Sequence, residues 1–512
     1  MKICTSRALY VVIGISVTQI CYAATYDWNG VNSGGGQGVS DVWDTVTENW
    51  SGAGTIWPLD GLDNDAVFDT LGDLVTIDEG GVTVNDLRFL VDGYQITGAG
   101  LTLVGELDPV TVPQIYVEDA SLATIGVVIA GISGWEKSGL GDLSLSGANT
   151  YTGETIITQG LVRLQNASGL GSNLQGTIIG AEGSLDINGF NLGTEAFTIA
   201  GSGLFGDGAL INSGAAQINA IGRLALSANA AVGGSGRWDL RNSSPTLHLN
   251  GFTLSKLGSG SFSLVGATVT PGSGQLVVNA GELSIQTSTT MNGGAANKIT
   301  VNQNATLGMW GLTSAPVWSL ELNAGSTIRS QSGNNSWAGP IAVAGSVTLL
   351  AEGGLALNST ITGTADLTKM GTGAATLGGN NSWTAANVTV SAGALILNSS
   401  SALSGVTTVT TSGVGNAALV LGNQVTTGAG ASITLNGGGY NQFYGALSTA
   451  AGNTGTATWQ GNAIIGAATN VRVGSLNGVL HISGDISEAT AGSALTIRND
   501  ENTMSSVQLS GN

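Results

Sequence analysis

One short motif recurs three times along this chain of 512 residues, and it constrains the fold more than any other feature. The motif is a lysine, then two glycines at alternate positions, then an apolar strand, and it begins at Lys137, Lys256 and Lys369. Each copy ends in a further glycine that opens a second apolar pair, namely Gly160, Gly281 and Gly393. The copies lie roughly 115 residues apart, which exceeds one coil of a solenoid, so the repeat predicts modules of several coils.

Short runs in which apolar and polar residues alternate lie between and within these copies. Examples are Val82-Thr83-Val84, Leu101-Thr102-Leu103 and Leu143-Ser144-Leu145. A period of two is typical of β-strands, and no stretch after residue 24 shows helical spacing for three turns. Glycine accounts for 82 residues without a three-residue period, which excludes collagen. The pattern therefore predicts an all-β protein made of short strands.

The repeats and the short strands together predict a right-handed parallel β-helix. In such a solenoid, each coil of about 20 to 25 residues stacks its strands on those of the coils before and after it. Apolar side chains fill a narrow core, while Gly and Asn occupy the left-handed corners that other residues resist. Asn side chains at equivalent corners are also expected to form ladders.

The first copy of the motif carries a recognisable longer pattern. Lys137 to Gly147 reads Lys-x-Gly-x-Gly-x-Leu-x-Leu-x-Gly, and Asn-Thr-Tyr-Thr-Gly follows at Asn149. This pattern resembles the autotransporter-associated β-strand repeat of bacterial surface and secreted passenger proteins. The other two copies match more loosely, since they lack Tyr-Thr-Gly. The resemblance implies a passenger-like β-helix and says little about activity.

The N-terminal region differs from the rest of the chain in its tryptophans. Four of them fall close together, at Trp28, Trp43, Trp50 and Trp57. This resembles the Trp-rich start of proteins that carry the same repeat. We expect residues 24–100 to form a β cap, because the first coil of a solenoid would otherwise expose its core and a strand edge.

The remainder, residues 101–512, is predicted to form the β-helix. We expect repeat motifs near 137–164, 256–285 and 369–397 and a truncated motif at 506–512. Because that last motif is cut short, we expect the chain to be a fragment of a longer product.

Residues 1–23 have the pattern of a secretory signal peptide. Lys2 and Arg7 precede an apolar stretch, and small residues stand before the expected cleavage site. Both cysteines, Cys4 and Cys21, lie in this segment, so the mature chain is expected to have no disulfide. The protein is therefore predicted to be exported, and to be located at the cell surface, associated with the outer membrane or secreted.

The charge balance limits the partners that the chain can bind. Removal of the signal peptide leaves 12 basic against 33 acidic residues, a net charge of −21. Such a surface repels phosphate groups, so nucleic acids and anionic membranes are poor partners, and we expect no membrane span. Host-cell, glycan or matrix surfaces are better candidates, as are like copies of the chain, bound through the solenoid end or its side.

The sequence offers few candidates for metal or cofactor sites. His248 and His481 are the only histidines, and each stands between apolar residues, where an outward position is expected. Because they are far apart and the mature chain has no Cys, a zinc site or a Ser-His-Asp triad is poorly supported. Asp63 and Asp65 are weak candidates for Ca²⁺ within the densest run of carboxylates. We expect a solvated cap loop there, and no cofactor.

A catalytic site would need clustered charges, because β-helical lyases and hydrolases of polysaccharides use carboxylates together with Arg or Lys. Acidic residues between positions 140 and 480 are scattered singly, Asp186 among them. Only Arg237 to Arg241 brings opposite charges and an aromatic ring together, and we expect a surface strand with an ion pair there. A further hypothesis is a glycan-stacking face built from Trp310, Trp318, Trp337, Trp383 and Trp459.

These observations predict a non-catalytic surface or secreted β-solenoid that serves display, adhesion or matrix formation. On a repeated surface, many weak contacts add through multivalency. Two alternatives stay open at this point. One is a carbohydrate-active β-helix with lyase or hydrolase activity, and the other is a Ca²⁺-dependent binding module.

Overall fold

The computed structural model describes residues 24–28, 41–53, 56–59, 64–72, 74–105, 112–383, 386–414, 416–440, 445–466, 470–499 and 504–511. The predicted signal peptide, residues 1–23, lies outside the described residues. The chain forms two compact units, Met1–Ser243 (unit 1) and Ser244–Asn512 (unit 2).

The part of unit 1 that the structure describes contains strands of 2 to 12 residues and one 3₁₀ turn. Its largest set of hydrogen-bonded strands contains β1 (Ala24–Trp28), β2 (Asp41–Trp43), β3 (Trp50–Gly52), β4 (Asn64–Phe68), β5 (Leu74–Ile77), β7 (Leu87–Phe89), β8 (Gln95–Gly98), β10 (Gln114–Val117), β11 (Leu122–Ile125), β13 (Trp135–Ser138), β14 (Asp142–Leu145), β15 (Thr155–Leu164), β16 (Thr177–Asp186), β17 (Ala196–Gly201), β18 (Leu210–Asn212) and β20 (Arg223–Gly234). Two smaller sets contain β6 (Val82–Val84), β9 (Leu101–Leu103) and β12 (Ile129–Ala130), and β19 (Gln217–Ile221) with β21 (Trp238–Leu240). The 3₁₀ turn η1 spans Leu204–Gly206.

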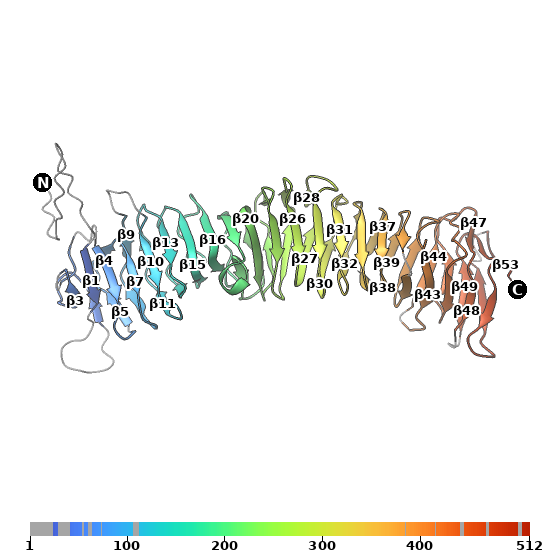
Figure 1. Cartoon of the computed structure of the whole chain (residues 1–512), viewed down its shortest axis with the longest axis horizontal. Coiled ribbons are helices and arrows are strands. Elements are labelled where there is room, and N and C mark those ends of the chain that lie inside the picture. Colours follow the sequence, from blue (N-terminus) through green and yellow to red (C-terminus); the bar gives the residue numbers. More distant parts are fainter. Residues whose placement is uncertain are drawn as a thin grey trace. The chain divides into compact units, whose positions relative to one another are not determined.

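Successive coils of unit 1 pair in parallel. β4 pairs with β7, β7 with β10, β10 with β13, β13 with β15 and β15 with β16, and Figure 1 shows these strands side by side from blue to green. The register stacks Leu87 on Ile115, and Ile157 on Ile179 and Ile199, in the core, with Lys137 in the coil between these two groups. Alternate residues therefore fill the core in every coil, as the period of two predicts.

A cluster of aromatic rings lies at the start of unit 1. Trp28, Trp43, Trp50 and Trp57 are each at most 1% exposed. The rings of Trp28 and Trp57 both lie 4.8 Å from that of Trp50, centroid to centroid. β1 pairs antiparallel with β3 and parallel with β4, so the chain passes here from a hairpin-like arrangement to parallel coils. The Trp-rich N-terminal β cap is thus confirmed as an aromatic cluster, whereas the boundary at residue 100 stays a prediction.

Unit 2 is built from four sets of strands. The first contains β22 (Thr246–His248), β23 (Thr253–Lys256), β25 (Thr268–Thr270), β26 (Gln275–Val278), β28 (Thr290–Met291), β29 (Lys298–Val301), β31 (Ser319–Leu322), β34 (Ile341–Ala344), β37 (Ile361–Thr364) and β40 (Ser382–Trp383). The second contains β24 (Ser261–Val265), β27 (Gly281–Gln286), β30 (Ala305–Trp310), β32 (Thr327–Ser332), β35 (Val347–Ala351), β38 (Leu367–Met370), β41 (Ala386–Val390), β43 (Val406–Thr411), β45 (Ser432–Leu435), β48 (Ala463–Ile465) and β51 (Ile486–Glu488). The third contains β33 (Asn334–Trp337), β36 (Gly354–Leu357), β39 (Ala374–Leu377), β42 (Ala394–Leu397), β44 (Ala418–Leu421), β46 (Leu447–Thr449), β49 (Val471–Ser475) and β52 (Leu495–Asn499), and the fourth β47 (Thr456–Trp459), β50 (Gly478–Ile482) and β53 (Ser505–Leu509).

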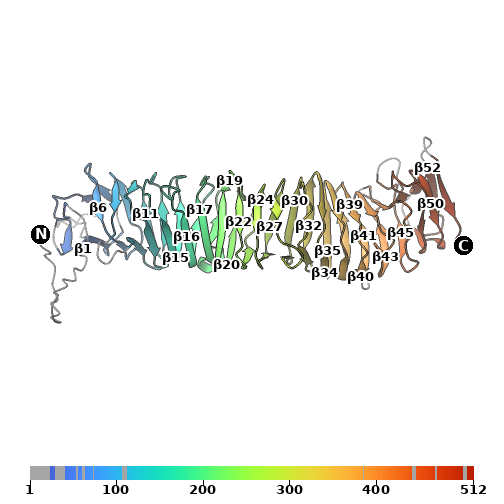
Figure 2. The ribbon, with the colours of Figure 1, turned by 90° about the horizontal axis from the view of Figure 1, so that it is seen from above.

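Unit 2 is a parallel β-solenoid as well. Each strand of the second set pairs in parallel with the strand one coil further on, and Figure 2 shows β24, β27, β30, β32 and β35 in this order. Buried Leu307, Ile328 and Leu349 follow one another in the core. The predicted all-β, parallel solenoid fold is therefore confirmed.

Helical structure is minimal in the described part of the chain. The 3₁₀ turn η1 is the only helical segment there, so the described residues contain no membrane-spanning helix.

Candidate functional site

The repeat lysine of the first copy points into the core of unit 1. Lys137 lies on β13 in a column of inward aliphatic side chains, and it is 0% exposed. Its Nζ donates to three backbone carbonyl oxygens, those of Ser138 and Gly139 at 2.7 Å and that of Gln159 at 3.3 Å. Gln159 belongs to β15, so the lysine joins two successive coils.

The other two copies repeat this cage of carbonyls. In each, Nζ donates to the carbonyls of the next two residues and to one carbonyl of the following coil. The acceptors are Leu257, Gly258 and Ala280 for Lys256, at 2.7, 3.0 and 3.2 Å, and Met370, Gly371 and Ala392 for Lys369, each at 2.9 Å. The three copies of the motif therefore encode one local structure.

Two glycines make room for this structure in the first copy. Gly139 has a φ of 73° and Gly160, in the next coil, a φ of 75°, a region that favours glycine. A Cβ at Gly160 would lie 2.8 Å from Nζ of Lys137 and 2.4 Å from the carbonyl oxygen of Gly141. The spacing of lysine and glycines in the motif thus follows from close packing between two coils.

Burial changes the acid–base properties of these lysines. It lowers the pKa of Lys137 to about 7 and the pKa of Lys256 and Lys369 to about 8. An ammonium group has three N–H donors, which equals the number of carbonyl oxygens around each Nζ. An amine with a lowered pKa can act as a nucleophile, but at most 2% of each lysine is exposed. The arrangement supports stacking of coils rather than chemistry on a substrate.

Sequence reasoning identified these lysines as motif residues but did not predict that they are buried. A signal was present, because each lysine is in phase with an apolar residue two positions earlier, at Trp135, Leu254 and Leu367. That phase places the lysine on the inward face of its strand.

Asparagine side chains provide a second kind of link between coils. The predicted ladder is present in unit 2, where Asn302 donates to Asn279 Oδ1 and Asn323 donates to Asn302 Oδ1, both at 2.7 Å. In the first and third copies of the motif, a buried Asn accepts from one coil and donates to the next: Asn149 between Ile129 and Gly169, and Asn381 between Ile361 and Ala402.

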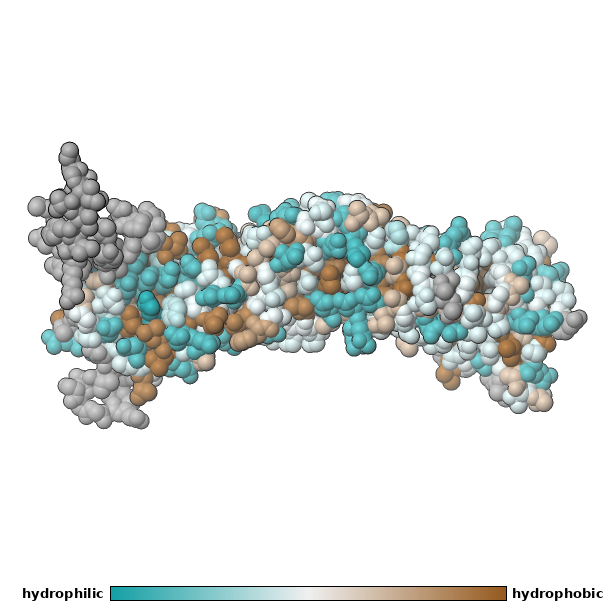
Figure 3. Space-filling view, in the orientation of Figure 1, coloured by the Kyte–Doolittle hydropathy of each residue, from teal (hydrophilic) through white to brown (hydrophobic). Residues whose placement is uncertain are grey.

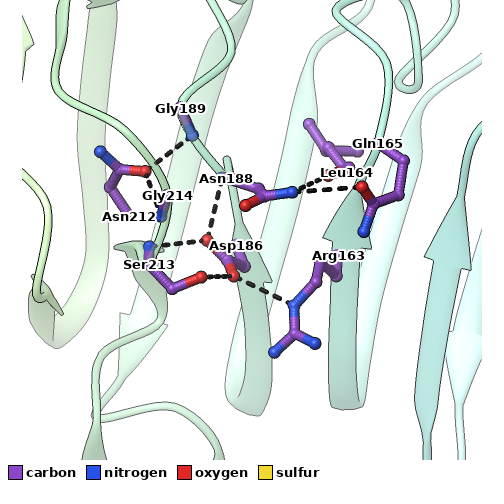
Figure 4. Close-up of polar contacts among 9 residues, drawn as sticks. All are labelled: Arg163, Leu164, Gln165, Asp186, Asn188, Gly189, Asn212, Ser213 and Gly214. Carbon is purple, nitrogen blue, oxygen red and sulfur yellow. Dashed lines mark hydrogen bonds and ion pairs between the residues drawn. The ribbon is translucent and has the colours of Figure 1, made fainter.

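Asp186 is the centre of a polar network in unit 1 that Figure 4 shows. Its side chain is 0% exposed and pairs with Arg163 of the preceding coil, with Nε 3.2 Å from Oδ2. Its oxygens also accept a hydrogen bond from the backbone N–H of Asn188 at 2.9 Å. Ser213 donates two more, one from its backbone N–H at 3.0 Å and one from its hydroxyl group. The carboxylate therefore binds donors of three coils of its own chain.

The network continues on both sides of Asp186. Asn188 donates to the carbonyl oxygen of Leu164 at 2.9 Å, and Asn212 Oδ1 accepts from the N–H groups of Gly189 and Gly214 at 2.7 and 3.1 Å. In the sequence Asp186 is one of several isolated acids, because Arg163 and Ser213 are each more than 20 residues away along the chain.

The candidate calcium ligands are only partly within the described residues. Asp63 lies outside them, while Asp65, on β4, accepts from Asn85 Nδ2 at 2.8 Å and from the N–H of Asp86 at 3.3 Å. Among the residues that the structure describes, no group of three or more His, Cys, Asp or Glu could hold a metal ion. The calcium hypothesis stays a prediction.

The two histidines are half-buried, and the residues directly before and after each of them are buried. His481 Nε2 lies 2.8 Å from Ser510 Oγ in the next coil.

The charged segment from Arg237 to Arg241 forms the ion pair that the sequence predicts. Arg237 Nη2 lies 2.9 Å from Asp239 Oδ2. The strand is not a surface strand, however, since Trp238 and Asp239 are 0% exposed. Trp238 faces the core and donates from Nε1 to the carbonyl oxygen of Gly233 at 3.0 Å.

The hypothesis of a glycan-stacking face built from five tryptophans is wrong for three of them. Trp318, Trp337 and Trp459 are 0% exposed, because they occupy inward positions where burial of a large ring stabilises the core. Trp310 is 46% exposed, and the side chain of Trp383 lies outside the described residues.

The outer face of unit 2 has a repeated chemistry of its own, and Figure 3 shows hydrophilic and near-neutral residues over most of its visible side. Threonines of seven successive coils stand in register on the second set of strands, each half-buried: Thr306, Thr327, Thr348, Thr368, Thr389, Thr410 and Thr434. Neighbouring coils lie about 4.8 Å apart, so the hydroxyl groups form a regular row.

Residues 136–164 and 367–397 match the passenger-associated-transport-repeat family. The chain carries passenger-associated transport repeats. The two matched segments contain the cages of Lys137 and Lys369, and the segment at Lys256 has the same cage. The resemblance inferred from the sequence is confirmed.

A second comparison points to an adhesin. Over 213 residues the chain is 32% identical to the adhesin BmaC autotransporter of Brucella suis biovar 1 (strain 1330). The match covers 36% of this chain and 6% of that protein, so the chain is distantly homologous to a small part of a much longer relative. No solved structure matches the chain.

Proposed function

We propose that the chain is the passenger-like part of an exported bacterial surface or secreted protein, and that it serves adhesion or display without catalysis. The observation that carries this proposal is the outer face of the solenoid, on which one polar residue type recurs coil after coil. A surface of this kind offers many equivalent weak contacts that add when a whole array binds at once.

The relatives support the same proposal. The distant relative is named an adhesin and an autotransporter, and the matched repeats are named for passenger-associated transport. The predicted signal peptide and the strongly acidic mature chain agree with an exported, soluble surface.

The groups with the most strongly shifted pKa values face the protein itself. Burial raises the pKa of Glu195 to about 7, but this carboxyl accepts from Thr177 Oγ1 at 2.7 Å inside unit 1. The repeat lysines face backbone carbonyls in the same way. Catalysis instead requires perturbed groups within mutual reach in an accessible site.

Binding and turnover assays on the full chain test this proposal. Neutral and acidic polysaccharides and fixed host cells are offered to the purified chain, and both bound protein and released sugar ends are measured. We expect binding without turnover. Turnover that is lost on Asp239→Asn or Arg241→Ala, but kept in the surface control Glu321→Gln, would overturn the non-catalytic proposal in favour of a carbohydrate-active enzyme.

A further inference from the structure

One tryptophan differs from the others whose side chains the structure describes. Trp310, the last residue of β30, is 46% exposed, whereas each of the other described tryptophan side chains is at most 1% exposed. A half-exposed indole leaves a large apolar ring surface in water that another molecule can cover. The exposed ring therefore suggests a contact with another molecule.

Trp310 lies on the outer face of the second set of strands in unit 2. It stands opposite Gln286 of β27 and Ser332 of β32, the two strands on either side of β30 in Figure 2. Two residues earlier on β30, Gly308 stands opposite Arg329. A Cβ at Gly308 would lie 2.1 Å from Glu282 Oε1, so the side chain of Glu282 fills the space that the glycine leaves.

Planar polar groups surround Arg329 on this face. Its guanidinium lies 3.4 Å from Glu282 Oε2 and 2.9 Å from Glu352 Oε2. With its amide oxygen turned toward the guanidinium, Gln331 accepts from Nη1 at 2.9 Å. These contacts hold the polar groups in fixed positions on the same face as the exposed indole ring, and we call Glu282, Trp310, Arg329, Gln331 and Glu352 the Trp310 platform.

We propose that the Trp310 platform binds neutral glycans. The flat face of a pyranose ring exposes C–H groups that pack on an aromatic ring, as apolar ligand surface does on Trp in general. The hydroxyl groups at the edge of the sugar can form directional hydrogen bonds with carboxylate, amide and guanidinium groups.

The charge of the platform selects among glycans. Two carboxylates and one guanidinium leave a net negative charge, and the mature chain is itself strongly acidic. Uronic acids and sulfated sugars are therefore repelled, whereas neutral hexoses and N-acetylhexosamines are not. The site lies on the outer face of paired strands, and weak contacts there gain strength from multivalent presentation. This inference rests on the proposed adhesive function and names its ligand class.

The test uses the full chain and two readouts. Binding is measured on an array of neutral, uronic-acid and sulfated oligosaccharides, and acrylamide quenching of tryptophan fluorescence is measured with and without the best-bound neutral oligosaccharide. The variants are Trp310→Ala, Trp310→Phe and Arg329→Ala. Met370→Ala is the matched control, because Met370 is 43% exposed on β38 of the same set of strands and lies outside the platform. Circular dichroism verifies that each variant is folded.

We expect neutral oligosaccharides to bind and to protect one accessible tryptophan from acrylamide. Trp310→Ala should lower the affinity at least tenfold, Arg329→Ala should lower it several-fold, Trp310→Phe should keep part of it, and Met370→Ala should leave it unchanged. Equal binding by Trp310→Ala and the unmodified chain, or a preference for acidic sugars, would overturn the assignment.

Absence of neutral glycan binding would also overturn it, and cell adhesion then separates the two proposals. If the chain on beads still adheres to cells, the adhesive function stands with a ligand other than a neutral glycan. If it does not adhere, the adhesive function fails as well.

Discussion

Gly160 of one coil packs against the ammonium group of Lys137 in the preceding coil, so closely that a Cβ at Gly160 would lie 2.8 Å from Nζ. The same relationship joins Gly281 to Lys256 and Gly393 to Lys369, where the corresponding distance is 2.9 Å. The repeat motif therefore encodes this contact, and the sequence contains the motif three times.

The contact predicts that Gly160→Ala destabilises unit 1 strongly. The left-handed φ alone costs an alanine about 1 kcal/mol, and the steric conflict with Lys137 and a backbone carbonyl raises the total to about 3 kcal/mol or more. The measurement is hydrogen exchange of β13 to β16, because local protection does not require two-state unfolding.

Gly193→Ala is the matched control for this substitution. Gly193 also has a positive φ, of 61°, but a Cβ there would meet nothing within 4 Å. It isolates the backbone strain, so equal effects of Gly160→Ala and Gly193→Ala would refute close packing against the lysine.

The lowered lysine pKa values predict that stability rises with pH. The folded chain releases protons from Lys137, Lys256 and Lys369 at about pH 7 to 8, whereas the unfolded chain keeps them up to about pH 10.4. Between these values the unfolded state binds more protons, so the free energy of unfolding increases with pH in this window.

Thermal unfolding at about pH 7, 8, 9 and 10 measures this slope. Replacing all three lysines by Met should remove most of it, while Lys298→Met, a half-exposed lysine paired with Glu321, should leave it intact. A flat or falling profile of the unmodified chain would contradict the lowered values and indicate that the carbonyl cage holds the ammonium form.

Much of the fold could be predicted from the sequence, because alternation and repeat spacing are local signals. Leu143-Ser144-Leu145 indicates its own strand, and the recurrence at Lys137, Lys256 and Lys369 indicates stacked coils. The polar network could not be predicted in the same way. The pairing of Arg163 with Asp186 can be predicted only if the length of the coil between them is known. Loops of variable length hide that coil length in the sequence.

Whether a large side chain points into the core or toward solvent could not be predicted from the sequence either. The sequence does not distinguish Trp318 and Trp337 from Trp310. In the structure, however, Trp318 and Trp337 are buried in the core, whereas Trp310 is half-exposed. Their orientation depends on the register of each strand relative to its corner, and a shift of one residue reverses it.

Asp186→Asn is predicted to destabilise unit 1 by about 2 to 4 kcal/mol, because an amide would leave buried donors without the charge that they bind. Glu321→Gln is the control, since Glu321 and its partner Lys298 are nearly 40% exposed and such pairs contribute at most about 1 kcal/mol. Protection of the amides of Asn188 and Ser213 from hydrogen exchange reports the loss directly. Unchanged protection in Asp186→Asn would contradict a stabilising role for the network.

Removal of divalent ions is predicted to leave the melting temperature unchanged. Asp65 already binds two donors of its own chain, so a chelator should find no stabilising ion to remove. A fall in melting temperature with EDTA, reversed by Ca²⁺ and abolished by Asp63→Asn or Asp65→Asn, would instead support the calcium-dependent binding module.

The most direct test of the adhesive function measures how attachment depends on the density of the chain on a surface. Beads coated with increasing amounts of the mature chain are placed on host-cell layers and washed, with beads carrying the heat-unfolded chain as the control. Attachment through a repeated surface predicts retention that rises more steeply than the coating density, while the soluble chain releases no sugar products. Retention equal to that of the control beads at every density, or polysaccharide cleavage by the soluble chain, would contradict it.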